Sequence, residues 1–299
     1  MKIFYCDQFA YPLPPEHRFP AKKYGLLRAQ VAAKLVPPGQ LSVPEAASDE
    51  QILRAHDAGY LERVATGQLT LKESRRIGLP WSPELVERSR RAAGGTIGAC
   101  RAALADGVAV NLSGGTHHAF GDHGEGFCVF NDCAIAARAL QAERRVRRVA
   151  IVDCDVHQGN GTAAIFSGDT TVFTFSIHGA KNFPFHKEHS DLDLELDDGT
   201  EDAAYLAALR RGLEHVRGEG GVDLAIYLAG ADPYAGDSLG RLSVSSAGLA
   251  ERDRMVFEVC RQAGWPVAAV MAGGYGRRIQ DTVDIHFETV RIALETANR

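Results

Sequence analysis

A short run of acidic and histidine side chains follows an apolar segment near the middle of the chain. In AIVDCDVHQGNG (150–161), Asp153, Asp155 and His157 lie two residues apart, and glycines follow them. Side chains two residues apart in an extended segment project to the same side, so Asp155 and His157 can share a metal ion. Asp232, in AGADPYAGD, offers a second carboxylate from a distant segment. Two oxygens and one nitrogen leave a further position open for water, as a catalytic zinc requires.

Two adjacent histidines and a tyrosine could supply the proton transfers that such a metal site needs. His117 and His118 lie in GGTHHAFGDHGEG, where flanking glycines allow both rings to reach one pocket. Histidine is the usual general acid or base near neutral pH, and Asp153 can orient a neighbouring imidazole. Tyr275, in AGGYG, can donate to a developing oxyanion. Exposed loop histidines, turn-capping carboxylates and a packed tyrosine remain the plain alternatives.

The polar residues follow buried-looking segments that alternate with helical patterns. Apolar runs rich in β-branched residues, typical of strands buried on both faces, occur at 3–5, 108–112, 149–152, 171–177, 224–229 and 267–272. Helical candidates occur at 83–106, 131–144, 201–217 and 246–263, with helix starts indicated at Thr200–Ala203 and at Ser245 or Ser246. This alternation predicts an α/β protein with a mainly parallel sheet and helices on both faces.

In open sheets of this kind, ligands bind beyond the carboxyl ends of the strands. Four of the predicted strands are followed by side chains that could bind a metal or transfer protons. We therefore expect these side chains to share one pocket. No Pro/Gly/Ser-rich linker divides the chain convincingly, so residues 1–299 are expected to form a single catalytic domain, and 37–48 is expected to be only a loop.

Bulk composition restricts the function classes. The net charge of −5 argues against a constitutive nucleic-acid binder. The six cysteines form no CxxC pair, which argues against a thiolate zinc site and fits a reducing compartment. No stretch reaches the roughly 18 apolar residues of a membrane span, and the N-terminus lacks a signal-peptide apolar region. We therefore expect a cytoplasmic protein without membrane partners; its oligomeric state stays open.

Five ordered motifs give the sequence a family resemblance. GGTHHA, GFCVFND, DCDVHQGNG, AGADPYAGDSLGRLSVS and GGYG together resemble the zinc-dependent histone deacetylase family, and the similarity extends from 54 to 278. The stretches DVHQGNG, GTEDAAYL and GDSLGRLSVSSAGLAERDRMVF look most like class IV, the histone deacetylase 11-type branch. The resemblance implies the arginase/deacetylase fold, a parallel eight-stranded sheet, and an amidohydrolase activity.

The resemblance also implies a cofactor. Asp155, His157 and Asp232 would bind Zn²⁺, and the same site could hold Fe²⁺. A structural monovalent cation, K⁺, is compatible with the family pattern. The related arginase-type hydrolases need two manganese ions and extra carboxylates, whereas this chain has Gln158 and Gly159 after the histidine.

By the same resemblance, His118 would be the general base and later the acid to the leaving amine. His117, hydrogen-bonded to Asp153, would assist electrostatically, and Tyr275 would donate to the carbonyl oxygen. Asn160 stands where class I members carry an aspartate. An amide there would orient His118 without adding negative charge, so His118 should be less basic than in the aspartate version.

The expected substrate is an acylated lysine in a protein or peptide. Phe127 and Phe183 would flank a tunnel for the acyl-lysine stem, and the Gly126 carbonyl would accept from the substrate amide. The class IV-like pattern leaves acetyl and longer acyl groups open. An acetylated polyamine or another small amide is the alternative, for which Asp122 and Glu125 would be acidic residues near the mouth. Solvated loop charges are the plain interpretation of both acids, and the one we favour. A non-catalytic acyl-lysine-binding module is a further alternative from another class.

Overall fold

A parallel β-sheet forms the centre of the protein, whose computed structural model describes residues 1–37 and 39–299. Its eight strands lie in the order β2-β1-β3-β8-β7-β4-β5-β6, and every neighbouring pair is parallel. The strands are β1 (Ile3–Phe4), β2 (Leu41–Ser42), β3 (Val108–Asn111), β4 (Val149–Asp153), β5 (Val172–Gly179), β6 (Leu192–Leu196), β7 (Leu224–Leu228) and β8 (Val267–Val270). The predicted fold class is confirmed.

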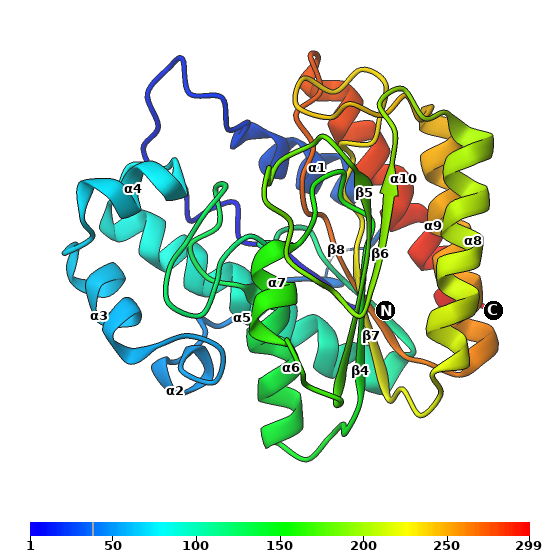
Figure 1. Cartoon of the computed structure of the whole chain (residues 1–299), viewed down its shortest axis with the longest axis horizontal. Coiled ribbons are helices and arrows are strands. Elements are labelled where there is room, and N and C mark those ends of the chain that lie inside the picture. Colours follow the sequence, from blue (N-terminus) through cyan, green and yellow to red (C-terminus); the bar gives the residue numbers. More distant parts are fainter. Residues whose placement is uncertain (38) are drawn as a thin grey trace.

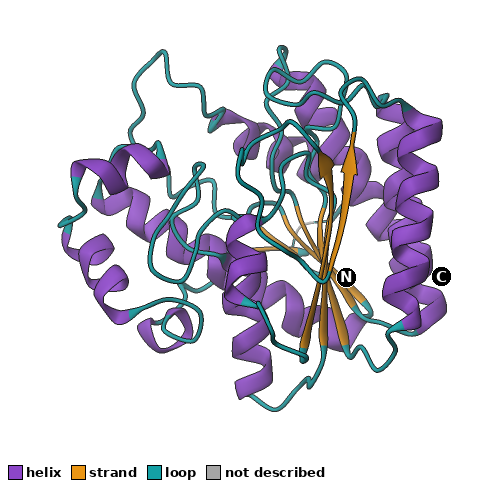
Figure 2. Ribbon diagram, in the orientation of Figure 1, coloured by secondary structure: helices purple, strands orange, loops and turns teal. Residues whose placement is uncertain are grey.

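Helices cover both faces of the sheet (Figures 1 and 2). The helices of the described residues are α1 (Lys22–Lys34), α2 (Asp49–Ile52), α3 (Ala58–Thr66), α4 (Leu71–Ile77), α5 (Pro83–Asp106), α6 (Asp132–Ala142), α7 (Asn160–Ile165), α8 (Asp202–Gly218), α9 (Ser246–Ala263) and α10 (Ile279–Ala297). In Figure 1, α8, α9 and α10 lie on one side of the sheet, while α5 and α6 lie on the other. Successive residues of β7 therefore alternate between two cores: Tyr227 packs on the α8–α10 side and Leu228 on the α5–α6 side.

Apolar runs in the sequence mark the central strands of the sheet but neither of its edges. All six predicted apolar runs are strands, whereas β2 and β6 are not anticipated. The prediction that 37–48 is only a loop is wrong at Leu41–Ser42, which pairs with β1 at the sheet edge; Pro38 lies outside the described residues. The β6 segment LDLEL alternates leucine with acidic residues because it is a half-buried edge strand that pairs on one side with β5.

Both predicted helix starts are confirmed in position, but only one has the expected cap. Ser245 is the N-cap of α9, and its hydroxyl oxygen accepts from the Gly248 amide at 3.0 Å. Helix α8 begins at Asp202, within the predicted range Thr200–Ala203, but the capping box expected there is wrong because Glu201, the residue before the helix, makes no side-chain cap. The Thr200 hydroxyl donates instead to a carbonyl in the preceding turn. Helices α1 to α4, α7 and α10 were not anticipated.

The carboxyl ends of four adjacent strands lie side by side and bring together motifs that are distant in the sequence. Asn111 of β3 lies beside Val270 of β8, Val270 beside Leu228 of β7, and Leu228 beside Asp153 of β4. These four residues form a continuous row at the carboxyl ends of adjacent strands. The loops that leave this row therefore start side by side, as the sequence predicts for a shared pocket.

Two further features concern the environment of the chain. None of the helices in residues 1–37 and 39–299 has the combined length and apolar character that crossing a membrane requires. All six cysteines are free thiols and are buried.

We expect Ser245→Ala to lower the free energy of unfolding by about 1 kcal/mol, because it removes a helix N-cap. Urea titration followed by circular dichroism measures the change. Ser246→Ala, an exposed neighbour, is the matched control and should stay within about 0.5 kcal/mol of the wild type. Equal losses in both variants would contradict the assignment of Ser245 as the cap.

Candidate active site

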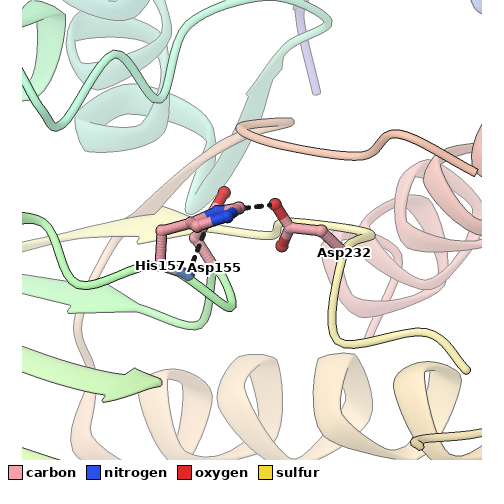
Figure 3. A group of neighbouring side chains, drawn as sticks. All are labelled: Asp155, His157 and Asp232. Carbon is pink, nitrogen blue, oxygen red and sulfur yellow. Dashed lines mark hydrogen bonds and ion pairs between the residues drawn. The ribbon is translucent and has the colours of Figure 1, made fainter. Parts of the chain in front are cut away.

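Asp155, His157 and Asp232 converge at the carboxyl ends of β4 and β7 (Figure 3). One potential ligand atom from each lies within 4.8 Å of the others, and all three residues are buried. The Nδ1 atom of His157 lies 2.9 Å from Oδ1 of Asp155 and 3.3 Å from Oδ2 of Asp232. Three residues separated by up to 77 positions in the sequence thus form a single cluster.

Backbone amides hold both carboxylates, and one oxygen of each carboxylate faces the imidazole of His157. The Val156 amide donates to Oδ1 of Asp232 at 2.9 Å, and the Gly273 amide donates to Oδ2 of Asp155 at 2.7 Å. Within the described chain, Oδ2 of Asp232 has no hydrogen-bond partner. A buried carboxylate oxygen left without a partner is costly, and a cation would satisfy it. Two carboxylates and an imidazole are also a donor set that suits Zn²⁺.

The electrostatics of the cluster also favour a bound cation. Burial, reinforced by the charge of Asp155, raises the pKa of Asp232 to about 7. Burial lowers the pKa of His157, but its close contacts with the carboxylates of Asp155 and Asp232 and their negative charges outweigh this effect and raise it to about 10. Without a cation, these groups therefore retain protons that stabilise the buried negative charge. A divalent cation would displace those protons, which couples metal binding to proton release.

Gly273 makes room for the cluster. A Cβ atom at this position would lie 2.0 Å from Oδ2 of Asp232 and 2.5 Å from Oδ2 of Asp155. No side chain fits there without displacing a carboxylate. Gly273, the first glycine of AGGYG, is therefore needed for close approach of the backbone to the two acids.

The expected extended geometry of this segment is only partly right. Strand β4 ends at Asp153, and the chain bends over residues 155–157. Oδ1 of Asp153 accepts from the Asp155 amide, and Oδ1 of Asp155 accepts from the His157 amide, each at 3.0 Å. These side-chain-to-backbone bonds, spaced two residues apart, turn the chain locally.

The two adjacent histidines lie in different electrostatic environments. Nδ1 of His117 donates to Oδ2 of Asp153 at 2.6 Å, as predicted. Burial opposes its charge, but Asp153 and Asp155 outweigh this and raise the pKa of His117 to about 9. Nδ1 of His118 faces the neutral Asn160 at 2.7 Å, and burial together with the charges of His117 and His157 lowers the pKa of His118 well below its usual value. Near pH 7, His117 is protonated and His118 is a neutral base.

Asn160 links His118 to the mouth of the pocket. Its Oδ1 accepts from His118, and its Nδ2 donates to Oε2 of Glu125 at 3.0 Å. Glu125 thereby fixes which end of the amide faces the imidazole. The sequence analysis placed Glu125 near the mouth but did not identify this contact.

Tyr275 is held by a loop that the sequence analysis did not connect to it. The Tyr275 amide donates to Oδ2 of the buried Asp237 at 2.6 Å, and the Ser238 amide donates to the Tyr275 carbonyl at 3.1 Å. Tyr275, His118 and His157 line one cavity. Burial, then the charges of Asp155 and Asp232, raise the pKa of Tyr275, so its hydroxyl keeps its proton. Asp237 lies in AGADPYAGDSLG, but only its place in that motif could have singled it out.

Lys23 is a second residue that the sequence analysis missed. Its ammonium group is buried and donates to the carbonyls of Ala272 at 3.1 Å and Gly274 at 3.4 Å. It also lies 5.5 Å from the centre of the Tyr275 ring. Burial lowers the pKa of Lys23 to about 8. The lysine thus holds both carbonyls that flank Gly273, yet nothing in the local sequence KKYG indicates this contact.

A cavity of about 840 Å³ leads from the surface to His118, His157 and Tyr275. Phe127, Phe183 and Gly126 line it, as predicted. Phe183 packs edge-on against His118, with ring centres 5.0 Å apart. Gly126 has φ = 54°, and a Cβ atom there would lie 2.7 Å from Cδ2 of His118. The cavity is narrow beside His118, so position 126 requires glycine.

Asp122 and Glu125 are separated by the structure. Glu125 lines the mouth of this cavity. Asp122 lines a different cavity beside His56 and Phe120, and its carboxylate contacts His123. The expectation that both acids lie near the mouth is therefore wrong for Asp122.

Comparisons with known proteins identify the family of the chain. Residues 17–290 match the family model described as the histone deacetylase domain. The chain belongs to the histone deacetylase family. It is 45% identical over 285 residues to an uncharacterised protein of Picosynechococcus sp., with 95% of each chain covered. It is 31% identical over 286 residues to Histone deacetylase 2 of Arabidopsis thaliana, covering 90% of this chain and 73% of that protein.

The fold is also similar to that of a solved histone deacetylase homologue. A crystal structure of an HDAC homologue complexed with SAHA superposes with a TM-score of 0.85 at 24% sequence identity. The superposition covers 100% of this chain and 84% of that one. At this level of identity the similarity supports the parallel-sheet fold.

We expect Asp232→Ala to lose the bound metal, because it removes the carboxylate oxygen that lacks a hydrogen-bond partner. Zinc content per chain, measured by mass spectrometry after dialysis, should fall from near one to near zero. Asp198→Ala, which removes a carboxylate outside the cluster, should retain it. Wild-type zinc content in the Asp232→Ala protein would show that this ligand set is wrong.

Proposed function

We propose that this protein is a zinc-dependent deacylase that hydrolyses the side-chain amide of acylated lysine, with residues 1–299 as one catalytic domain. The observation that carries the proposal is the buried cluster of Asp155, His157 and Asp232 at the floor of a cavity that His118 and Tyr275 also line. Metal ligands, a neutral base and a proton donor are thus accessible to one substrate.

The proposed chemistry divides between the metal and the side chains. When bound, Zn²⁺ would polarise the amide carbonyl and lower the pKa of a water molecule. His118, which is neutral near pH 7, would take a proton from the attacking water and later deliver it to the leaving amine. His117 stays protonated beside Asp153 and would stabilise developing negative charge.

Tyr275 would donate its hydroxyl proton in a hydrogen bond to the oxyanion. A raised pKa makes the neutral phenol available over the working pH range. Lys23 and Asp237 would act as positioning residues, since both hold the backbone beside Tyr275. A donor fixed before the reaction avoids the cost of reorientation in the transition state.

The substrate stem would lie between Phe127 and Phe183. Their rings line the cavity above His118 and Tyr275, which suits the apolar methylenes of lysine. The Gly126 carbonyl is proposed to accept from the substrate amide. The site floor has a volume of about 50 Å³, and the adjoining cavity behind it also has about 50 Å³. We infer that acetyl and similarly short acyl groups are preferred over long fatty-acyl chains.

The finer assignments rest on the sequence pattern. We propose membership of class IV because Asn160 replaces an aspartate and because of the stretch GDSLGRLSVSSAGLAERDRMVF. Fe²⁺ in the same ligands, a structural K⁺ and a cytoplasmic location stay predictions. A panel of acetyl- to myristoyl-lysine peptides and acetylpolyamines, assayed on zinc-quantified protein, tests the function. Turnover of acetylpolyamines alone would favour the small-amide alternative, and no turnover at all would favour a binding module.

We expect Tyr275→Phe to lower kcat about 10²- to 10³-fold, the typical cost of losing one oxyanion donor. Zinc content should remain at the wild-type level, because the tyrosine is not a ligand in the proposed site. Tyr234→Phe removes a hydroxyl from a half-buried tyrosine outside the site and is the matched control. Full activity of Tyr275→Phe would exclude the tyrosine from the mechanism.

We expect Asn160→Asp to move the acidic limb of the pH–rate profile to higher pH. A carboxylate beside His118 favours the imidazolium and raises its pKa. Because the reaction needs neutral His118, activity would then be lost at a higher pH as the solution is acidified. The measurement is kcat/KM against pH, with the exposed Asn298→Asp as control. An acidic limb that stays in place or moves down would reject this role for His118.

A further inference from the structure

The mouth of the active-site cavity is lined by an excess of basic side chains. These are Arg18, Arg75, Arg76, Lys181 and Arg241, which we call the basic rim. Glu125 is the one carboxylate in the same lining, and its Oε2 accepts from Asn160. The protein as a whole carries a net charge of −5, so the positive mouth is a local feature.

Three of the five basic groups are not neutralised by neighbours. Across the described residues, no carboxylate lies within 4.0 Å of Arg18, Arg75 or Arg76, and all three side chains are exposed. Lys181 and Arg241 share a single carboxylate, Asp198, at 3.9 and 3.0 Å. The rim therefore retains net positive charge facing the cavity entrance.

Backbone hydrogen bonds join the part of the basic rim on α4 to the residues that line the cavity. Arg75 and Arg76 lie in the last turn of α4. The Arg76 carbonyl accepts from the Gly126 amide at 3.1 Å, and the Ile77 carbonyl accepts from the Phe127 amide at 2.7 Å. The two arginines therefore have a defined position relative to the cavity rather than lying on a free loop.

Asn182 fixes the opposite side. Its Nδ2 donates to the Leu239 carbonyl at 2.9 Å, and its Oδ1 accepts from the Arg241 amide at 3.2 Å. This buried side chain joins the loop that carries Lys181 to the loop that carries Arg241. Positive charge is thus held on both sides of the entrance.

We propose that the basic rim selects acylated lysine within an acidic segment of peptide. This inference rests on the proposed deacylase function. The charges lie at the mouth, so they would meet the residues that flank the lysine rather than the acyl group at the floor. Phe185, 82% exposed and 6.2 Å from Phe183 between ring centres, adds an apolar contact surface suited to a polypeptide. The same charges repel acylpolyamines and lysine- or arginine-rich segments.

Three peptides that share one acetyl-lysine but carry acidic, neutral or basic flanks test the proposal, with acetylspermidine as a fourth substrate. For the wild type at low ionic strength, kcat/KM should fall from acidic to neutral to basic flanks. Raising the ionic strength to about 1 M shortens the screening length to about 3 Å, so the three values should converge. Equal values at low salt, or a preference for basic flanks or acetylspermidine, would overturn the proposal.

The double variant Arg75→Glu/Arg76→Glu should lower the ratio of acidic-flank to neutral-flank kcat/KM by roughly 3- to 10-fold, because a few exposed charge pairs each contribute a small factor. The matched control is Arg210→Glu/Arg211→Glu, an exposed adjacent pair on α8 that does not line the cavity. It makes the same charge change and should keep the wild-type ratio. An equal fall in both double variants would show a general charge effect and would contradict the rim assignment.

Failure of this inference is distinguishable from failure of the proposed function. Turnover of the neutral-flank peptide by zinc-loaded wild type shows deacylation whatever the flank preference is. If that peptide is cleaved without preference for acidic flanks, the basic-rim proposal alone fails. If zinc-loaded protein cleaves none of the substrates, the deacylase proposal fails, and the rim proposal fails with it.

Discussion

Two carboxylates kept close together away from water are the constraint on which this active site depends. Asp155 and Asp232 both face one imidazole nitrogen; two backbone amides hold Asp155, and one holds Asp232. The buried guanidinium of Arg252 braces the loops beneath them by donating to the Gly230 carbonyl and, at 3.5 Å, to the Cys154 carbonyl. It is itself paired with the buried Asp253 at 2.8 Å. This network opposes the mutual repulsion of the two acids and keeps the loops in place.

The sequence predicts the parts of the fold whose signal is local. Central strands such as β4 and β7 are buried on both faces, so they appear as continuous apolar runs. Edge strands lack this signature: β6 alternates leucine with acidic residues, and β2 has only two residues. The sequence also singles out Asp155 and His157, which the structure brings together with Asp232. The bends that orient Asp155 and His157 come from hydrogen bonds that a strand-based argument does not include.

Other parts of the site depend on contacts that no local pattern reveals. Lys23 meets the Ala272 carbonyl across a separation of 249 residues, so its role follows only from the folded chain. The two adjacent histidines show the same limit. Their residue type and position suggest similar behaviour, yet Asp153 makes His117 basic, while the neutral Asn160 and the surrounding positive charge leave His118 unprotonated. Distinct chemical roles therefore arise from partners that lie 36 and 42 residues away in the sequence.

The bonds between α4 and the tunnel wall are made entirely by main-chain atoms, from Arg76 to Gly126 and from Ile77 to Phe127. The exposed side chains of Arg75 and Arg76 can consequently change without breaking these bonds. Such an arrangement separates the choice of partner from the chemistry of the reaction centre. If the basic rim selects substrates as proposed, mutations at these two arginines would change the preferred substrate over generations while the reaction centre is inherited intact.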